Sequence, residues 1–196
     1  MDLELRIVDL LARNPGRKFT INEIARELEE YYSFVHRTAG RLAKDDVIDK
    51  SRVGKSYICS LNMENEKTLA LMVLGEIEKK DEFYGRNREL GLMLEDLVKS
   101  LSTQPGVDAI VLFGSYAKGA ATKESDVDIL VVAGRKAEIG RTAKEMYAKY
   151  GKEINPVIIT SQEFRKQKEK AIIKEIISGH CVLYGAKNFV NLVFGK

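Results

Sequence analysis

The sequence predicts an α+β protein built from three segments. Residues 1–62 combine helical apolar periodicity with two short β-rich runs, residues 63–103 have helical periodicity alone, and residues 104–196 alternate β-rich and helical runs. Hydrophobic residues make up 44% of the 196 and charged residues 31%, which permits a packed core and excludes a disordered chain.

Composition also limits where the protein is expected to act. No apolar run approaches the ~20 residues that cross a bilayer, and the N-terminus has no signal-peptide cleavage site. The two cysteines, Cys59 and Cys181, lack metal-ligand spacing and are expected to be buried thiols in a reducing compartment. We therefore expect a cytoplasmic protein with no membrane partner.

Three helices are expected at the start of the first segment. An apolar stripe over residues 3–11 indicates the first helix, which ends at an Asn-Pro-Gly breaker. Thr20 is suited to cap the second helix because Glu23 follows three positions later, as in a capping box. Ser33 is expected to cap the third helix, which runs to about Lys44.

Two short strands complete the first segment. Residues 47–48 and 57–59 read as strands, and the polar run 51–56, which contains a glycine, reads as the hairpin tip between them. Three helices followed by a hairpin resemble a winged helix-turn-helix domain of prokaryotic transcription regulators, over about residues 3–62. The resemblance implies a DNA-binding domain over residues 1–62.

The third helix and the hairpin carry the predicted DNA contacts. Apolar positions of the helix can face the core and leave a basic face outside. The residues expected to contact double-stranded DNA are Ser33, His36, Arg37, Arg41 and Lys44 on the helix and Arg52 and Lys55 on the wing, where Lys50 adds a charge. The other interpretation is a protein-docking module whose charges form an ordinary solvated face. The net charge of +3 is too small to decide between them.

Residues 63–103 are expected to form a helical linker or dimerisation segment. Leucines recur with a 4-3-4 spacing that suits a short helical seam between two copies of the chain, at Leu90, Leu94, Leu97 and Leu101. The alternative is that this stripe only covers the core of its own domain. Homodimerisation is therefore an expectation with an open alternative.

The third segment, residues 104–196, is expected to form a mixed sheet with helices. Strands are expected at 107–113, 127–133 and 154–160, and helices at 136–150 and 171–177. Ser161 is expected to cap another helix, with Glu163 following it. Residues 182–184 fit a short strand or a packed apolar turn equally well.

A glycine-serine turn and an acidic pair form the main chemical motif of this segment, VLFGSYAKGAATKESDVDILVV at residues 111–132. Gly114 lets the backbone approach a ligand closely, and the N–H groups after it, with the Ser115 hydroxyl, favour phosphate. Asp126 and Asp128 are two positions apart on a predicted strand, so both lie on one face. Their repulsion is relieved by a divalent cation with oxygen ligands. Each part alone is common, and the prediction depends on their order between two apolar strands.

This motif resembles that of the minimal nucleotidyltransferases of the DNA polymerase β superfamily, in which a Gly-Ser pair precedes Asp-x-Asp. The resemblance covers about residues 104–185. It implies five site residues: Gly114, Ser115 and Lys118 for binding a nucleoside triphosphate, and Asp126 and Asp128 for catalysis and for binding Mg²⁺ or Mn²⁺. Lys123 is a further lysine within reach of phosphates, although both lysines also fit a solvated surface.

One position departs from the family pattern. The strand after the long helix usually carries a third carboxylate, and here the corresponding residue is Asn155. An amide can coordinate a cation weakly but cannot act as a base. Glu153, two residues earlier and on the same face, is the alternative metal ligand, unless it only marks a polar strand end. His180 is interpreted as a helix-end residue rather than a base.

Two functions remain open at this stage. The first is a metal-dependent nucleotidyltransferase with a DNA-binding domain, which moves a nucleoside monophosphate from a triphosphate to an unknown acceptor, such as a protein or a small molecule. By analogy with antitoxin relatives, the acceptor would be a partner toxin. The second is a transcription regulator whose nucleotidyltransferase-like domain binds nucleotide without turnover, which Asn155 favours. A weaker third interpretation is an interaction scaffold.

Overall fold

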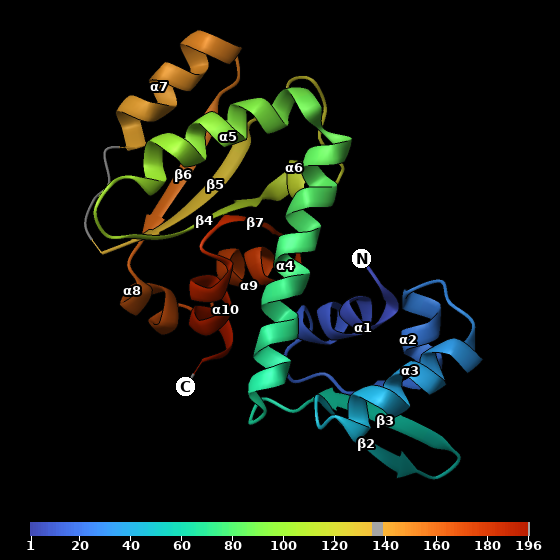
Figure 1. Ribbon diagram of the computed structural model, residues 1–196. Coiled ribbons are helices and arrows are strands. Elements are labelled where there is room, and N and C mark those ends of the chain that lie inside the picture. The colour runs from blue at the N-terminus through green and yellow to red at the C-terminus, as the bar shows by residue number, and fades with distance from the viewer. Residues whose placement is uncertain (135–138, 196) are drawn as a thin grey trace. The chain divides into compact units, whose positions relative to one another are not determined.

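The computed structural model describes residues 1–134 and 139–195 and divides into two compact units, Met1–Gly75 and Glu76–Lys196 (Figure 1). The division falls within the long helix α4 (Glu66–Arg86). The boundaries expected from the sequence were after residues 62 and 103. In the described residues, no helix is both long enough and apolar enough to cross a bilayer.

The first unit contains helices and a small antiparallel sheet in which the strand order is β1-β3-β2. Its elements before α4 are α1 (Leu3–Ala12), β1 (Phe19–Thr20), α2 (Ile21–Glu27), α3 (Tyr32–Lys44), β2 (Ile48–Val53) and β3 (Ser56–Leu61). The predicted capping box is present, because the Thr20 side chain accepts from the Glu23 backbone and the Glu23 carboxylate accepts from the Thr20 N–H at 2.7 Å. The three helices and the hairpin are thus observed, while their assignment as a winged helix-turn-helix stays a prediction.

Two local predictions in this unit were wrong. Ser33 does not cap α3: it is the second residue of the helix, and the N-cap is Tyr31, which makes no capping bond with its side chain. The hairpin tip is shorter than predicted, since only Gly54 and Lys55 connect the strands and Val53 pairs with Ser56. The positive φ of Gly54, 60°, allows this tight turn.

The second unit is built on a four-stranded mixed sheet with the order β6-β5-β4-β7. Strand β4 is antiparallel to both neighbours, and β5 and β6 are parallel. After α4 the elements are α5 (Arg88–Ser102), β4 (Val107–Phe113), α6 (Gly114–Ala117), β5 (Val127–Ala133), α7 (Ile139–Tyr150), β6 (Ile154–Ile159), α8 (Ser161–Lys166), α9 (Ala171–Ser178), β7 (Cys181–Tyr184) and α10 (Ala186–Phe194). The predicted start of the α7 helix at residue 136 lies outside the described residues.

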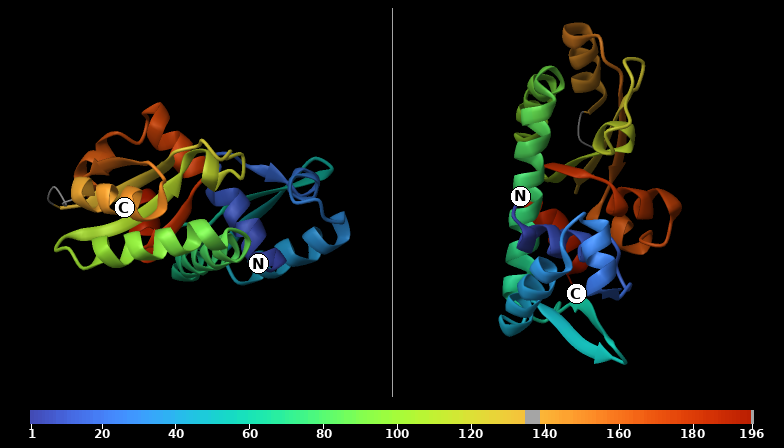
Figure 2. Two further views of the ribbon diagram at one scale, coloured as in Figure 1. Left: turned by 90° about the horizontal axis from the view of Figure 1, so that it is seen from above. Right: turned by 90° about the vertical axis from the view of Figure 1, so that its right-hand side faces the viewer.

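Helices cover both faces of this sheet, and the sheet side chains are therefore buried on both sides (Figures 1 and 2). On one face α5 and α7 pack on alternate strand residues such as Ile110, Leu112 and Ile129. On the other face α8, α9 and α10 pack on the intervening residues, such as Val111 and Leu130. This burial explains why the central strands are continuous apolar runs rather than alternating ones.

Three details of the second unit complete or correct the sequence analysis. Residues 181–184 form a strand, β7, that pairs with β4, which settles the alternative left open. The cap of α8 is Thr160 rather than Ser161: Thr160 and Glu163 form the capping box, and the strand before it ends at Ile159. Helix α10 was not predicted.

The leucine stripe of residues 90–101 belongs to the core of the second unit. Leu94, Leu97 and Leu101 are fully buried and pack with the sheet and with α7. Leu90 is partly buried against the same cluster. The stripe therefore covers its own domain, which was the alternative to an intermolecular seam.

A buried ionic cluster joins α4 to the end of α9 within the second unit. Glu76 Oε1 lies 2.6 Å from Lys79 Nζ and 3.2 Å from His180 Nε2, and His180 Nδ1 lies 2.9 Å from the Ile176 carbonyl. Burial alone would raise the pKa of Glu76, but the charges and hydrogen bonds of His180 and Lys79 outweigh it and lower this pKa to about 2. His180 therefore holds a helix end in place.

Leu97→Ala should lower the free energy of unfolding by about 2–5 kcal/mol, because it leaves a cavity under the sheet. Leu92→Ala on the same helix should change it by about 0.5 kcal/mol or less, since Leu92 is 61% exposed. Urea unfolding of both variants at several protein concentrations checks this. If the urea midpoint rises with protein concentration for the wild type but not for Leu97→Ala, Leu97 would instead lie in a dimer seam.

Candidate active site

The turn after β4 brings the backbone against a carboxylate. Gly114 begins α6 with a φ of 70°, and a Cβ built on it would lie 2.1 Å from Asp128 Oδ2. This approach follows from the sheet, because Phe113 pairs with Asp128 in the antiparallel register of β4 and β5. Only glycine combines this positive φ with so close a neighbour. The short helix that starts here has no side-chain capping bond from Phe113, its N-cap.

Three polar side chains gather at the start of β5 and β6. Asp126 precedes β5, Val127 is fully buried, and the half-buried Asp128 follows it on the opposite face of the sheet. In the parallel register Asp128 pairs with Asn155, whose Nδ2 donates to Asp126 Oδ2 at 3.2 Å. The carboxylates of Asp126 and Asp128 are thus neighbours of the amide of Asn155, the residue that differs from the family pattern. They lie at the end of the sheet where the Gly114 turn is found.

The electrostatic environment of Asp128 is unfavourable for a carboxylate in the absence of a cation. Burial raises the pKa of Asp128, a hydrogen bond with Asn155 lowers it, and the negative charges of Asp126 and Glu175 raise it further. The resulting pKa is above the usual range for an aspartate. A bound positive charge would relieve both the burial penalty and the repulsion.

Glu153 lies where the parallel register places it, beside Asp126. Its carbonyl accepts from the Val127 N–H at 2.9 Å, which fixes the backbone, while its side chain is exposed. Over residues 1–134 and 139–195, no three His, Cys, Asp or Glu side chains gather closely enough to hold a metal ion together. Of the two predicted carboxylates, that of Asp128 lies against the Gly114 turn, and that of Asp126 accepts from Asn155 beside it.

The two lysines of the motif differ in their contacts. Lys118 caps the end of α6, and its Nζ lies 2.6 Å from Glu175 Oε1. Lys123 is exposed in the loop before β5, and its carbonyl accepts from Lys152. Glu175, which comes from α9, was not predicted from the sequence. No local pattern signals it, because only the packing of α9 beside the sheet brings it to the turn.

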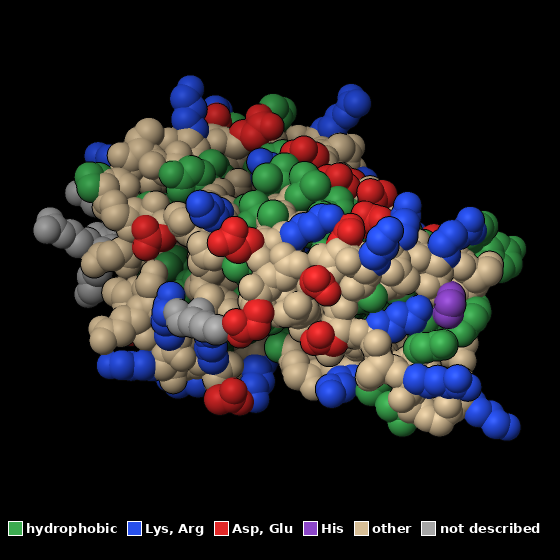
Figure 3. All heavy atoms as spheres, turned by 60° about the horizontal axis from the view of Figure 1, so that its bottom comes forward, with side chains coloured by type: hydrophobic (Ala, Val, Ile, Leu, Met, Phe, Trp, Pro, Cys, Tyr) green, Lys and Arg blue, Asp and Glu red, His purple; other side chains and the backbone are tan. Residues whose placement is uncertain are grey.

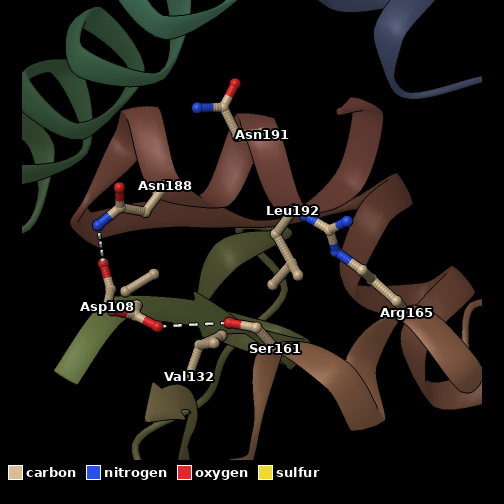
Figure 4. A pocket seen from close by; sticks show the side chains of 8 residues that line it. Asp108, Val132, Ser161, Arg165, Asn188, Asn191 and Leu192 are labelled. Carbon is tan, nitrogen blue, oxygen red and sulfur yellow. Dashed lines mark hydrogen bonds between the residues drawn. The ribbon is translucent and has the colours of Figure 1, made fainter. Parts of the chain in front are cut away.

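A separate hollow of about 210 Å³ lies at the opposite end of β4 from Gly114 (Figure 4). Asp108 lines it, with its carboxylate accepting from Ser161 Oγ at 3.3 Å and its carbonyl accepting from Asn188 Nδ2 at 2.8 Å. These bonds join β4 to α8 and α10. None of the predicted site residues lines this hollow.

The predicted DNA-binding residues of the first unit are mostly exposed. Ser33, Arg37, Arg41, Lys44, Arg52 and Lys55 are exposed, and His36 is half-buried between the rings of Tyr32 and Tyr57. Arg41 is paired with Glu4 at 3.1 Å, and the Arg37 guanidinium lies 5.3 Å from the centre of the Phe34 ring. In the view of Figure 3, Lys and Arg side chains lie beside a histidine and apolar side chains at the right-hand end.

A mixed sheet with an acidic pair beside a glycine-serine turn defines a nucleotidyltransferase-type domain, and comparison with known proteins agrees. The nucleotidyltransferase domain family matches residues 94–184. Three similar proteins of Methanocaldococcus jannaschii carry the name putative protein adenylyltransferase. MJ1305 is 31% identical over 51% of this chain and 75% of its own length. MJ0604 is 33% identical over 40% of this chain and 79% of its own length. MJ0141 is 30% identical over 43% of this chain and 88% of its own length.

The chain therefore belongs to the nucleotidyltransferase family, and its relatives support nucleotidyl transfer as its activity. A solved structure described as a toxin-antitoxin with AMP-PNP is also similar, with a TM-score of 0.39 and 20% identity over 53% of this chain and 78% of the other. That likeness is too low to carry an argument about ligand or assembly.

Gly114→Ala should destabilise the protein more than Gly119→Ala, although both glycines have a φ near 70°. The strain of a side chain at such a φ is about 1–2 kcal/mol in each variant. At Gly114 the new methyl group also meets Asp128, whereas at Gly119 it meets nothing within 4 Å. The additional loss is about 1–3 kcal/mol, measured by urea unfolding. Equal losses would show that Asp128 does not lie against the turn.

Proposed function

We propose that this protein transfers AMP from ATP to a hydroxyl group of another protein, with the help of a divalent cation. The observation that carries the proposal is the position of Asp128 against the Gly114 turn, with Asp126 two residues before it and hydrogen-bonded to Asn155. The names of the three archaeal relatives support both the adenylyl group and the protein acceptor.

The residues at the turn fit a hard cation such as Mg²⁺ or Mn²⁺. Two carboxylates, with the amide oxygen of Asn155 as a weaker donor after rotation of its side chain, supply the oxygen ligands that such ions prefer. The uncompensated charge around Asp128 favours the same occupant. When bound, the cation would neutralise phosphate charge and the charge that develops on the leaving pyrophosphate. Glu153 is a further proposed ligand only if its exposed side chain turns towards Asp126.

The chain's own residues would bind and orient the nucleotide. The uncapped N–H groups after Gly114 and the Ser115 hydroxyl can donate to the triphosphate, and Asp126 and Asp128 would hold the cation that neutralises its phosphates. The acceptor oxygen then forms a bond to the α-phosphorus while the bond to the β-phosphate oxygen breaks and pyrophosphate leaves. The acceptor proton passes to solvent or to a carboxylate, because the Asn155 amide is not basic.

The second candidate is a nucleotide sensor without turnover, which the amide at Asn155 favours. Its neutral side chain donates to Asp126 instead of adding a third negative charge. Such a protein would bind a nucleoside triphosphate with a cation but would transfer nothing. Both candidates share the same binding residues, so that only transfer distinguishes them.

Asp128→Asn should reduce the transfer of label from α-³²P-ATP to protein acceptors in an extract of the source cells by about 100-fold or more. Asp108→Asn is the matched control, because that carboxylate lies at the other end of β4. Addition of EDTA should have the effect of Asp128→Asn. Binding of ATP without any transfer, at any acceptor concentration, would support the sensor and contradict the transferase.

For the first unit we propose DNA binding, on the observation that the basic side chains of α3 and the hairpin are exposed and close in the fold. Arg37, Arg52 and Lys55 are exposed and so open to a polyanion, whereas Arg41 shares its charge with Glu4. The partner is double-stranded DNA if α3 enters the major groove. A protein-docking face remains the competing interpretation.

Arg37→Ala should change the sequence preference of DNA binding, because a helix guanidinium can donate to guanine edges. Lys55→Ala should weaken binding to all sequences and reduce the salt slope by about 1, as expected for one phosphate contact. Lys187→Ala, an exposed lysine of α10 in the other unit, is the control. Fluorescence anisotropy with a randomised duplex pool checks this. DNA binding unchanged by both variants would favour the docking face.

A further inference from the structure

Lys118 and Glu175 form an ion pair at the rim of the candidate active site. The Nζ–Oε1 distance is 2.6 Å, and the two side chains are 43% and 46% exposed. Lys118 follows the Gly114 turn by one helical turn, and Glu175 comes from α9. The residue proposed to bind phosphate is therefore already occupied by a carboxylate.

The packing of the lysine stem shows that this pair is positioned by the fold. Glu175 and Gly179 are four residues apart and lie on the same side of the end of α9. A Cβ on Gly179 would lie 3.2 Å from Lys118 Cε and 3.3 Å from its Cγ, so the lysine stem runs closely along this surface. The end of α9 is itself fixed by His180, which bonds to the Ile176 carbonyl and to Glu76.

The pair also lies within the electrostatic reach of the acidic pair. The negative charge of Glu175 helps to raise the pKa of Asp128. A polyphosphate that enters beside Asp128 therefore meets both the cation of Lys118 and the anion of Glu175. The phosphates and the Glu175 carboxylate therefore compete for the same ammonium group.

We infer that Glu175 competes with the phosphates of the nucleotide for Lys118 and must release the lysine when the nucleotide binds, so that Glu175 limits nucleotide affinity. This inference rests on the proposed nucleotide binding at Gly114. An exposed ion pair contributes little to stability, so its exchange for a polyphosphate is easy. The phosphates carry more charge than a single carboxylate and form stronger charge-assisted hydrogen bonds with the ammonium group.

Four proteins test the inference by calorimetric titration with ATP and Mg²⁺: the wild type, Glu175→Gln, Lys118→Met and the double variant. Glu175→Gln should tighten ATP binding by about two- to fivefold, since Lys118 no longer has to be released. Lys118→Met should weaken binding by about tenfold or more. In the Lys118→Met background, Glu175→Gln should change the affinity by less than about twofold.

Two controls separate this exchange from general effects of charge and folding. Glu169→Gln removes an equally charged side chain that pairs with Lys174 at 2.7 Å, and it should leave ATP binding unchanged. Adenosine, which has no phosphate, should bind the wild type and Glu175→Gln equally. Circular dichroism establishes that each variant is folded.

The outcomes decide between the inference and its premise. If the wild type binds no nucleoside triphosphate, both the proposed function and the inference are overturned. If it binds ATP but Glu175→Gln has no effect or weakens binding, only the inference is overturned. Equal tightening with and without Lys118 also overturns it, because Glu175 would then act by direct repulsion and not through the lysine.

Discussion

The close approach of the Asp128 carboxylate to the backbone at Gly114 is the constraint on which the rest of the site depends. It arises from the pairing of β4 with β5, which places Phe113 opposite Asp128. The absence of a Cβ at Gly114 leaves room for the carboxylate, and the positive φ of that residue redirects the chain into α6. Backbone donors and acidic side chains therefore face the same small region, as binding a metal-bound polyphosphate requires.

The side chains around this region carry more negative than positive charge, and part of the negative charge is balanced. Asp126, Asp128 and Glu175 are acidic, whereas Lys118 is the cation paired with one of them. Asn155 stands where a third carboxylate is usual and donates to Asp126, which reduces the repulsion without adding a base. The arrangement favours ligands that bring a cation and phosphates together.

The sequence predicts the sheet and the turn well because their signals are local. The bounds of β4 and β5 agree with the prediction, since these apolar runs are buried on both faces and end at glycine or aspartate. The caps were less predictable, because Thr160 and Ser161 are adjacent and both can accept from a helix N–H. Glu175 could not be predicted, because only tertiary packing brings α9 to the turn. The leucine stripe could not be assigned, since a spacing does not say what covers it.

A crystal structure with Mg²⁺ and a non-hydrolysable ATP analogue would show directly whether a nucleotide binds at the Gly114 turn. We expect the triphosphate at the N–H groups after Gly114, a cation between the carboxylates of Asp126 and Asp128, and Lys118 turned from Glu175 to a phosphate. A nucleotide bound elsewhere, for example in the hollow beside Asp108, or carboxylates that contact no cation, would contradict it.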